Sequence, residues 1–466
     1  MHVTQQPRRF RRRGWIILAA LLLTISLIGT TGAIATNLRA SGQPYYQSAV
    51  GTPVFASPPT PTSAALLPGS AIGLPPSSSI SSTLTKDRPP RLPAGMGIVY
   101  TTGSGIYLLT SDAATPEKLT TPGYTSLVPP QLTSDGHLLY AGNGLYLADL
   151  SQIEATPLQI VSIDTTRQVI ASMAISADGQ QVFWTVEPHN GSGAITLYEA
   201  TLTASGASSP MALYSQPAGA CPCYAIFGLG PASATGVPTL LLTDDLGTPA
   251  DQGTGLWVFD QAHHQIGQEL LSEKEGQIPL ALSPNRTQLA YAPTTGEVPE
   301  PTDGSVPQQV GSQPYGNSMS VAGWTANISN PVTIVPSQTN IHTFSTYHWI
   351  TTPIFSPDGK SIAYIQFSSD DNGPYDRHST LYTAATNGSG APAVIVNFTV
   401  RLVELGGWLD SHTLLLYADG GIYALDTRSA AISLLAVVTR YSHIIGLVPL
   451  SEGAAGGPNC HPQRIC

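Results

Sequence analysis

Between residues 96 and 450 the chain alternates short apolar runs with turn residues, and one phrase recurs along it. The phrase is an apolar run, a four-residue turn of the Ser-Pro-Asp-Gly kind, and a second apolar run that ends in an aromatic residue. Pro at the second turn position presets φ, Asp at the third bonds its own backbone, and Gly at the fourth accepts positive φ. Each copy therefore predicts a tight β-hairpin. The copies span residues 130–140, 173–183, 280–291, 353–364 and, in degenerate form, 406–417.

Each hairpin has a third strand beside it that carries Leu-Tyr or an equivalent pair, and a fourth apolar stretch closes the unit. Four strands in about 40 to 50 residues is typical of a β-propeller blade. The pattern predicts an all-β fold with seven four-stranded blades. Six or eight blades are the alternatives, because the unit around residues 225–230 is weakly marked. The third strands are at 144–149, 196–199, 255–260, 380–383 and 421–426.

The two ends of this repeat region complement each other. The first unit, residues 97–119, lacks an inner strand, and an apolar strand at 443–450 is left over at the C-terminal end. We expect the left-over strand to complete the first blade and close the ring. Closure removes the free sheet edges that promote aggregation.

The best-formed copy begins at Ser356, continues through Pro-Asp-Gly and Ile-Ala-Tyr364, and is followed by Leu381-Tyr382. This phrase resembles the TolB-type, WD-repeat-like propeller repeat of exported bacterial proteins and of prolyl-oligopeptidase-type peptidases. The resemblance covers residues 96–450 and implies the fold, since one such ring serves many functions. TolB itself has an additional N-terminal α/β domain, whereas this chain has a Pro-rich segment there.

The N-terminal part divides into a basic tail at residues 1–14, which contains five arginines, and an uncharged apolar stretch at 15–35. This stretch is long enough to cross a membrane as a signal anchor, and the arginines keep the N-terminus in the cytoplasm. The alternative is a signal peptide cleaved near Ala35. Both interpretations export the rest of the chain.

Residues 36–95 form a Pro/Ser/Thr-rich linker, which has no charged side chain between 41 and 85. Such a composition predicts a disordered stalk between the membrane and the propeller. Residues 451–466 form a C-terminal tail. Cell-membrane attachment through one span, with the propeller outside the cytoplasm, is the predicted topology.

Composition excludes some classes of protein. The 45 Gly and 40 Pro among 466 residues exclude a mainly helical fold. The formal net charge of −10 and the absence of basic clusters beyond the N-terminus disfavour nucleic-acid binding. In an oxidising compartment, two local disulfides, Cys221–Cys223 and Cys460–Cys466, are the preferred pairing over a four-thiolate metal site.

Insertions between the second and third strands of four units decorate one face of the predicted ring. Since rigid scaffolds present recognition residues on loops, this face is the candidate binding surface. His348, Trp349 and Trp408 are expected near its central mouth, although each ring could instead pack between blades. The insertions lie at residues 187–194, 244–253, 294–317 and 368–379.

One insertion contains Asp370, Asp371 and Asp376 around a Gly turn. Carboxylate oxygens in this arrangement are a weak calcium candidate, and a solvated loop is the alternative. No other cofactor is predicted.

No Gly-x-Ser-x-Gly elbow occurs, and no room remains for a hydrolase domain beyond the repeats, so we expect the chain not to be an enzyme. The main interpretation is a non-catalytic, membrane-tethered propeller that binds an extracytoplasmic protein, peptide or glycan through its loop-rich face. The alternative is an extracytoplasmic enzyme of the lyase or glycosidase type acting at the central channel. Clustered carboxylates with perturbed pKa values, together with a His at the channel mouth, would favour the alternative, and a channel lined by Tyr, Thr and aliphatic residues would favour binding.

Overall fold

The computed structural model describes most of the repeat region together with residues 71–72 and 90–95 of the linker, and every regular element within these ranges is a β-strand. All described residues belong to one compact unit, Gly42–Cys466. They are 71–72, 90–111, 115–125, 128–133, 135–189, 194–203, 206–217, 223–232, 237–244, 252–272, 277–293, 296–299, 312–315, 318–324, 328–336, 347–369, 378–398, 403–439 and 442–450.

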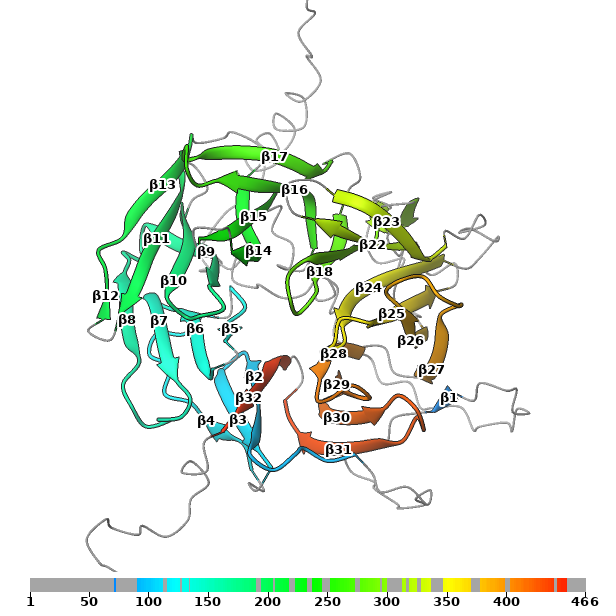
Figure 1. The fold of residues 1–466 in the computed structure, drawn as a ribbon. Coiled ribbons are helices and arrows are strands. Elements are labelled where there is room, and N and C mark those ends of the chain that lie inside the picture. The colour runs from blue at the N-terminus through cyan, green and yellow to red at the C-terminus, as the bar shows by residue number, and fades with distance from the viewer. Residues whose placement is uncertain are drawn as a thin grey trace, which may run out of the picture. The chain divides into compact units, whose positions relative to one another are not determined.

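The strands form seven four-stranded blades around a central axis (Figure 1), which confirms the predicted fold class and blade number. In the order from the axis outward, blade 1 contains β32 (His443–Pro449), β2 (Met96–Thr102), β3 (Gly105–Thr110) and β4 (Glu117–Lys118). Blade 2 contains β5 (Gln131–Leu132), β6 (His137–Ala141), β7 (Gly144–Asp149) and β8 (Leu158–Ser162). Blade 3 contains β9 (Gln168–Ile175), β10 (Gln181–Pro188), β11 (Ile195–Thr203) and β13 (Met211–Gln216), with β12 (Gly206–Ala207) beside β11.

The remaining blades follow the same order. Blade 4 contains β14 (Tyr224–Ala232), β15 (Pro238–Asp244), β16 (Gln252–Asp260) and β17 (Gln265–Leu271). Blade 5 contains β18 (Gln277–Leu282), β19 (Gln288–Tyr291), β22 (Met319–Trp324) and β23 (Ile328–Val335), with the hairpin β20 (Gly296–Pro299) and β21 (Ser312–Tyr315) inserted. Blade 6 contains β24 (Tyr347–Phe355), β25 (Ser361–Ser369), β26 (His378–Ala385) and β27 (Ala393–Phe398). Blade 7 contains β28 (Val403–Trp408), β29 (Thr413–Ala418), β30 (Gly421–Asp426) and β31 (Ile432–Val437).

The meander within each blade sorts its connections onto two faces. Turns from the first strand to the second lie on one face, which we call the tight-turn face. Connections from the second strand to the third, and the crossings between blades, lie on the other, the loop-rich face. The four predicted insertions join β10 to β11, β15 to β16, β19 to β22 and β25 to β26, so all of them belong to the loop-rich face.

One seam between blades differs from the others in the described part of the chain. The start of β16 pairs with the start of β18, from Gln252 opposite Pro279 to Thr254 opposite Gln277. This short ladder joins blades 4 and 5 into one eight-stranded sheet. A backbone connection therefore supplements side-chain packing at this seam.

The aromatic residues of the repeat stack across the second and third strands of a blade. Tyr364 lies opposite Tyr382 with ring centroids 5.3 Å apart, and Tyr140 lies opposite Tyr146 at 5.2 Å. Trp184 and Tyr198 repeat the arrangement in blade 3 at 5.6 Å. The recurring Tyr and Leu-Tyr are therefore partners in one cross-strand contact, which stabilises each blade.

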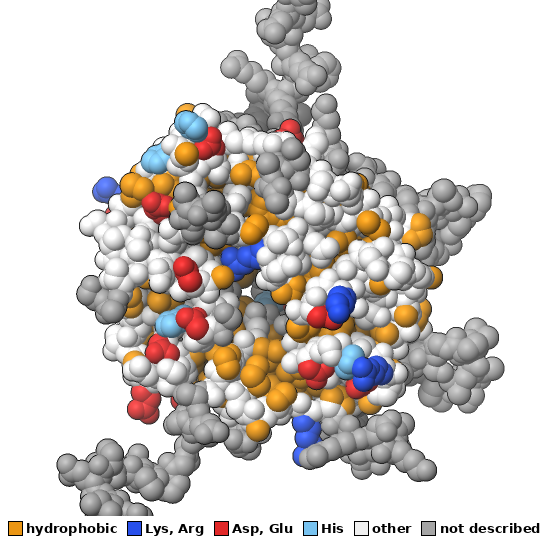
Figure 2. Space-filling model, viewed as in Figure 1, with side chains coloured by type: hydrophobic (Ala, Val, Ile, Leu, Met, Phe, Trp, Pro, Cys, Tyr) orange, Lys and Arg blue, Asp and Glu red, His pale blue; other side chains and the backbone are white. Residues whose placement is uncertain are grey.

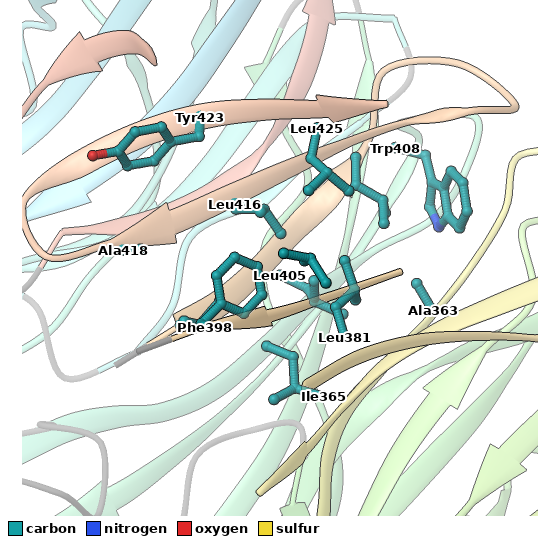
Figure 3. Close-up of a cluster of buried hydrophobic side chains, with 13 residues drawn as sticks. Ala363, Ile365, Leu381, Phe398, Leu405, Trp408, Leu416, Ala418, Tyr423 and Leu425 are labelled. Carbon is teal, nitrogen blue, oxygen red and sulfur yellow. The ribbon is translucent and has the colours of Figure 1, made fainter. Parts of the chain in front are cut away.

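The core lies between neighbouring blades. Figure 3 shows one such cluster, in which Leu381 and Phe398 of blade 6 point toward Leu405 and Leu416 of blade 7. Leu381 and Leu416 are fully buried. Burial of such a side chain contributes about 1.5–3 kcal/mol, so these interfaces hold the ring together.

The Ser-Pro-Asp-Gly turns have the predicted geometry. In blade 6, Ser356 Oγ donates to Asp358 Oδ1 at 2.7 Å and accepts the N–H of Ser361 at 3.0 Å. Gly359 has φ of 69° and donates its N–H to Ser356 O. The hydroxyl of Ser356 holds the pKa of Asp358 below its ordinary value.

Replacing Ser356 by Ala is expected to lower the free energy of unfolding by about 1 kcal/mol, because the buried N–H of Ser361 loses its side-chain acceptor. Ser356→Thr is the matched control, since Thr133 fills this position in blade 2 and binds Asp135 and the N–H of His137. Urea unfolding measures both variants. The depressed pKa of Asp358 stabilises the fold only while the carboxyl is ionised, so the difference from wild type should shrink as the pH falls through the carboxyl range. Equal losses for Ala and Thr would contradict the assigned role.

The predicted tail 1–14, span 15–35 and C-terminal tail 451–466 lie outside the described residues. Within the described ranges, no helix is long and apolar enough to cross a membrane. From the linker, β1 (Ala71–Ile72) pairs in parallel with the outer strand β27 of blade 6, and Pro90 O accepts a hydrogen bond from Ser433 of blade 7.

Candidate functional site

The inner strands carry polar residues where they begin, at the loop-rich face, and apolar residues where they end. Polar residues at the first or second position of six inner strands define what we call the channel mouth. The opposite ends of four of these strands are Ile175, Leu282, Phe355 and Trp408. The polar end of the central opening is therefore on the same face as the insertions. The channel mouth consists of Gln168, Tyr224, Gln277, Tyr347, His348, Glu404 and His443.

Glu404 and His443 form a carboxylate–imidazole pair at the channel mouth. His443 Nδ1 lies 2.9 Å from Glu404 Oε2, and the two side chains are 37% and 24% exposed, respectively. The pair bridges β28 of blade 7 and β32 of blade 1. Both side chains are thus accessible to a ligand while partly shielded from bulk water.

A glycine allows these two strands to approach. A Cβ at Gly406 would lie 2.5 Å from Ile444 Cδ1, so any other residue there would push β32 away from β28. Gly406 is two residues from Glu404, and Ile444 is next to His443. The close contact of Gly406 with Ile444 therefore holds the carboxylate and the imidazole within hydrogen-bond distance.

The pairing has a chemical consequence. When Nδ1–H of His443 donates to the carboxylate, the imidazole is held in one orientation and its basic nitrogen is Nε2. A carboxylate that orients an imidazole is the arrangement used for general acid–base catalysis. The channel mouth can therefore exchange a proton with a bound molecule.

The structure places the predicted aromatic residues at different ends of the channel. His348 and Trp349 lie at the start of β24, at the channel mouth, and their side chains are outside the described part. Trp408 lies at the opposite end of β28, is 8% exposed, and donates Nε1–H to Ile354 O at 3.5 Å. Figure 3 shows its indole beside the cluster between blades 6 and 7, where it contributes to packing.

Most of the other predicted site residues belong to segments outside the described part of the chain. Asp370, Asp371 and Asp376 lie outside the described residues, as do Cys221, Cys460 and Cys466. Cys223 is described, and its N–H donates to Asp244 Oδ1 at 2.7 Å. Among the residues with described positions, no group of three or more His, Cys, Asp or Glu side chains is placed to hold a metal ion.

Sequence reasoning identified the loop-rich face but missed Glu404 and His443. The available signal was their position, because each stands at the start of an apolar strand where other units have Gln or Tyr. Their proximity depends on the pairing of the last strand with the first blade.

No protein-family model matches the chain, and no curated protein sequence matches it either. Solved structures do match. A protein from Lactobacillus plantarum has 15% identity and a TM-score of 0.45 over 76% of this chain and 97% of its own. The periplasmic gluconolactonase of Pseudomonas aeruginosa has 12% identity and a TM-score of 0.43, covering 75% and 96%. An oligogalacturonate lyase from Vibrio parahaemolyticus has 10% identity and a TM-score of 0.33, covering 74% and 81%.

At these identities the similarity concerns the fold, and the chain is a seven-bladed β-propeller. The matches correct the expectation that the chain is not an enzyme. A gluconolactonase and an oligogalacturonate lyase are among the solved structures that it resembles.

Proposed function

We propose that the chain is a propeller enzyme of the lyase or glycosidase type, which acts on a glycan at the channel mouth with Glu404 and His443 as its acid–base pair. The observation that carries this proposal is the 2.9 Å contact between His443 Nδ1 and Glu404 Oε2 at the polar end of the channel. In this function Nε2 of His443 exchanges a proton with the substrate, and Glu404 orients the ring and stabilises its charged form.

The surroundings of the pair support a glycan as the substrate. The described side chains of the channel mouth include the exposed Gln168 and the half-buried Tyr224. The amide of Gln168 donates and accepts hydrogen bonds, as sugar hydroxyls require, whereas the ring of Tyr224 packs against Tyr214 and Trp257. Four insertions lie on the same face and could surround a chain-like substrate.

We further propose that the enzyme works outside the cytoplasm, on a tether, as a TolB-type ring. The support comes from the sequence: the arginines and apolar stretch of residues 1–35 and the Pro-rich linker to residue 95. Pairing of β32 with β2 supports closure of the ring by the C-terminal strand. Protease treatment of intact cells, followed by detection of the propeller, tests this placement, and a fully protected propeller would contradict it.

His443→Gln is expected to lower the turnover of the substrate about 100-fold, because the imidazole is replaced by an amide that exchanges no proton at neutral pH. The assay offers the protein polysaccharides rich in uronic acids, such as pectate and alginate, and a neutral polysaccharide, such as xylan. Unsaturated products measured by ultraviolet absorbance indicate a lyase, and new reducing ends without them indicate a glycosidase.

The matched control is His263→Gln. His263 Nδ1 contacts Asp260 Oδ2 at 2.8 Å, so the same pair of groups occurs on an exposed turn between β16 and β17, at the outer edge of blade 4. The control variant should keep wild-type turnover. A folded wild-type protein that converts none of these substrates, or equal activity of both variants, would overturn the proposal.

A further inference from the structure

Arg286 occupies a turn position at which three other blades have glycine. It is the fourth residue of the turn between β18 and β19, with φ of 60°. The corresponding residues Gly136, Gly179 and Gly359 have φ of 90°, 68° and 69°. L-residues are strained in this left-handed region, whereas glycine is not. The arginine is therefore a poorer choice than glycine for the turn itself.

The guanidinium of Arg286 also bears the cost of desolvation. Burial lowers its pKa, and none of the carboxylates in the described ranges acts to raise it. In the part of the chain that the structure describes, the ion pairs join other residues, and Arg286 is in none of them. The side chain is half-buried, and an anion from outside the chain would offset the desolvation of a half-buried charge that has no ion pair.

The position of the turn puts this charge at the end of the channel. β18 is the inner strand of blade 5 and ends at Leu282, so the turn that follows borders the channel on the tight-turn face. Figure 2 shows hydrophobic side chains near the central opening of the ring. A cation among apolar groups attracts an anion more strongly than one in water does.

We propose that Arg286 binds a small oxyanion, a carboxylate or a phosphate group, at the tight-turn end of the channel. The planar guanidinium fits two oxygens of such a group at once, which lysine cannot do. The anion offsets the desolvation of the charge, and the strained turn holds the side chain in place. This site is separate from Glu404 and His443, which lie at the other end of the channel, and it does not depend on the proposed enzymatic function.

Arg286→Gly tests the proposal in the full chain, because glycine restores the residue found in the other turns and the variant should fold. The probes are sodium acetate and inorganic phosphate, compared with sodium chloride at equal ionic strength. Wild type is expected to show a rise in Tm with one of the two probes. The variant should lose that rise and have a higher Tm than wild type without the probe, since the turn is no longer strained.

The control is Lys360→Gln, which removes a charge from the equivalent turn of blade 6 and should keep the rise in Tm. A response to acetate alone identifies a carboxylate site, a response to phosphate alone a phosphate site, and a response to both a general oxyanion site. An equal rise in wild type and Arg286→Gly would overturn the proposal. The absence of any rise in wild type beyond that with chloride would overturn it as well.

Discussion

Deleting residues 443–466, and with them β32, is expected to abolish the cooperative unfolding transition of the propeller. β32 pairs with β2 from Thr101 opposite His443 to Met96 opposite Pro449. Its side chains also enter the packing on both sides of blade 1: Val448 is fully buried toward blade 2, and Ile444 packs toward blade 7. Without β32, blade 1 loses its inner strand, and blade 7 loses the strand that packs against its inner end.

The expected size of this effect follows from the apolar residues removed. Ile444, Ile445, Leu447 and Val448 each contribute up to about 1.5–3 kcal/mol by burial. Their sum is comparable with the whole stability of a typical domain, about 5–15 kcal/mol. Urea unfolding followed by tryptophan fluorescence measures the transition. Deletion of residues 451–466 alone is the control and should leave it unchanged, whereas a wild-type transition in the longer deletion would show that the ring closes without β32.

Trp324→Ala is expected to lower the free energy of unfolding by about 3–5 kcal/mol, the range for removal of a large buried aromatic side chain. Trp324 is 2% exposed, and its indole from blade 5 lies directly over Gly230 of blade 4. The indole thus fills the interface between the two blades, and alanine would leave a cavity there. Urea unfolding at constant temperature measures the loss, and a change below 1 kcal/mol would contradict this packing role.

The glycine under the indole offers an independent check of the same contact. A Cβ at Gly230 would lie 2.0 Å from Cη2 of Trp324, so Gly230→Ala should destabilise the protein by about 1–3 kcal/mol through overpacking. At Gly228 the nearest atom, Leu282 Cδ1, is 3.5 Å away, which makes Gly228→Ala the matched control. In the double variant Gly230→Ala with Trp324→Ala, the overpacking should vanish, since the ring is gone.

The fold could be predicted because its signals are local. Blades 2, 3 and 6 repeat a turn whose residues determine its geometry and an aromatic pair whose members lie opposite each other in one sheet. The turn holding Arg286 was found although its glycine is missing, since Ser283 still binds Asn285 and the N–H of Gln288. Blade 4 was weakly marked around residues 225–230, and in it Leu242, not an aromatic residue, faces Trp257.

The candidate site could not be predicted to the same extent, because it depends on contacts between blades. Glu404 and His443 are 39 residues apart and belong to different sheets. Trp408 was expected at the mouth because it lies on an inner strand, but the direction of that strand places it at the other end. The sequence indicates which strands are innermost, whereas the meeting of two side chains across a seam depends on register and on Gly406.

The ladder between β16 and β18 makes the interface between blades 4 and 5 stronger than an interface held by side chains alone. Blades 4 and 5 share backbone hydrogen bonds, so these hydrogen bonds must break before the two blades separate. Thermal opening of the ring is therefore expected at other interfaces between blades. The interface between blades 7 and 1, where β28 meets β32, is held by side-chain packing in the described part of the molecule. Glu404 and His443 lie on opposite sides of this interface, so transient opening there would separate the two side chains.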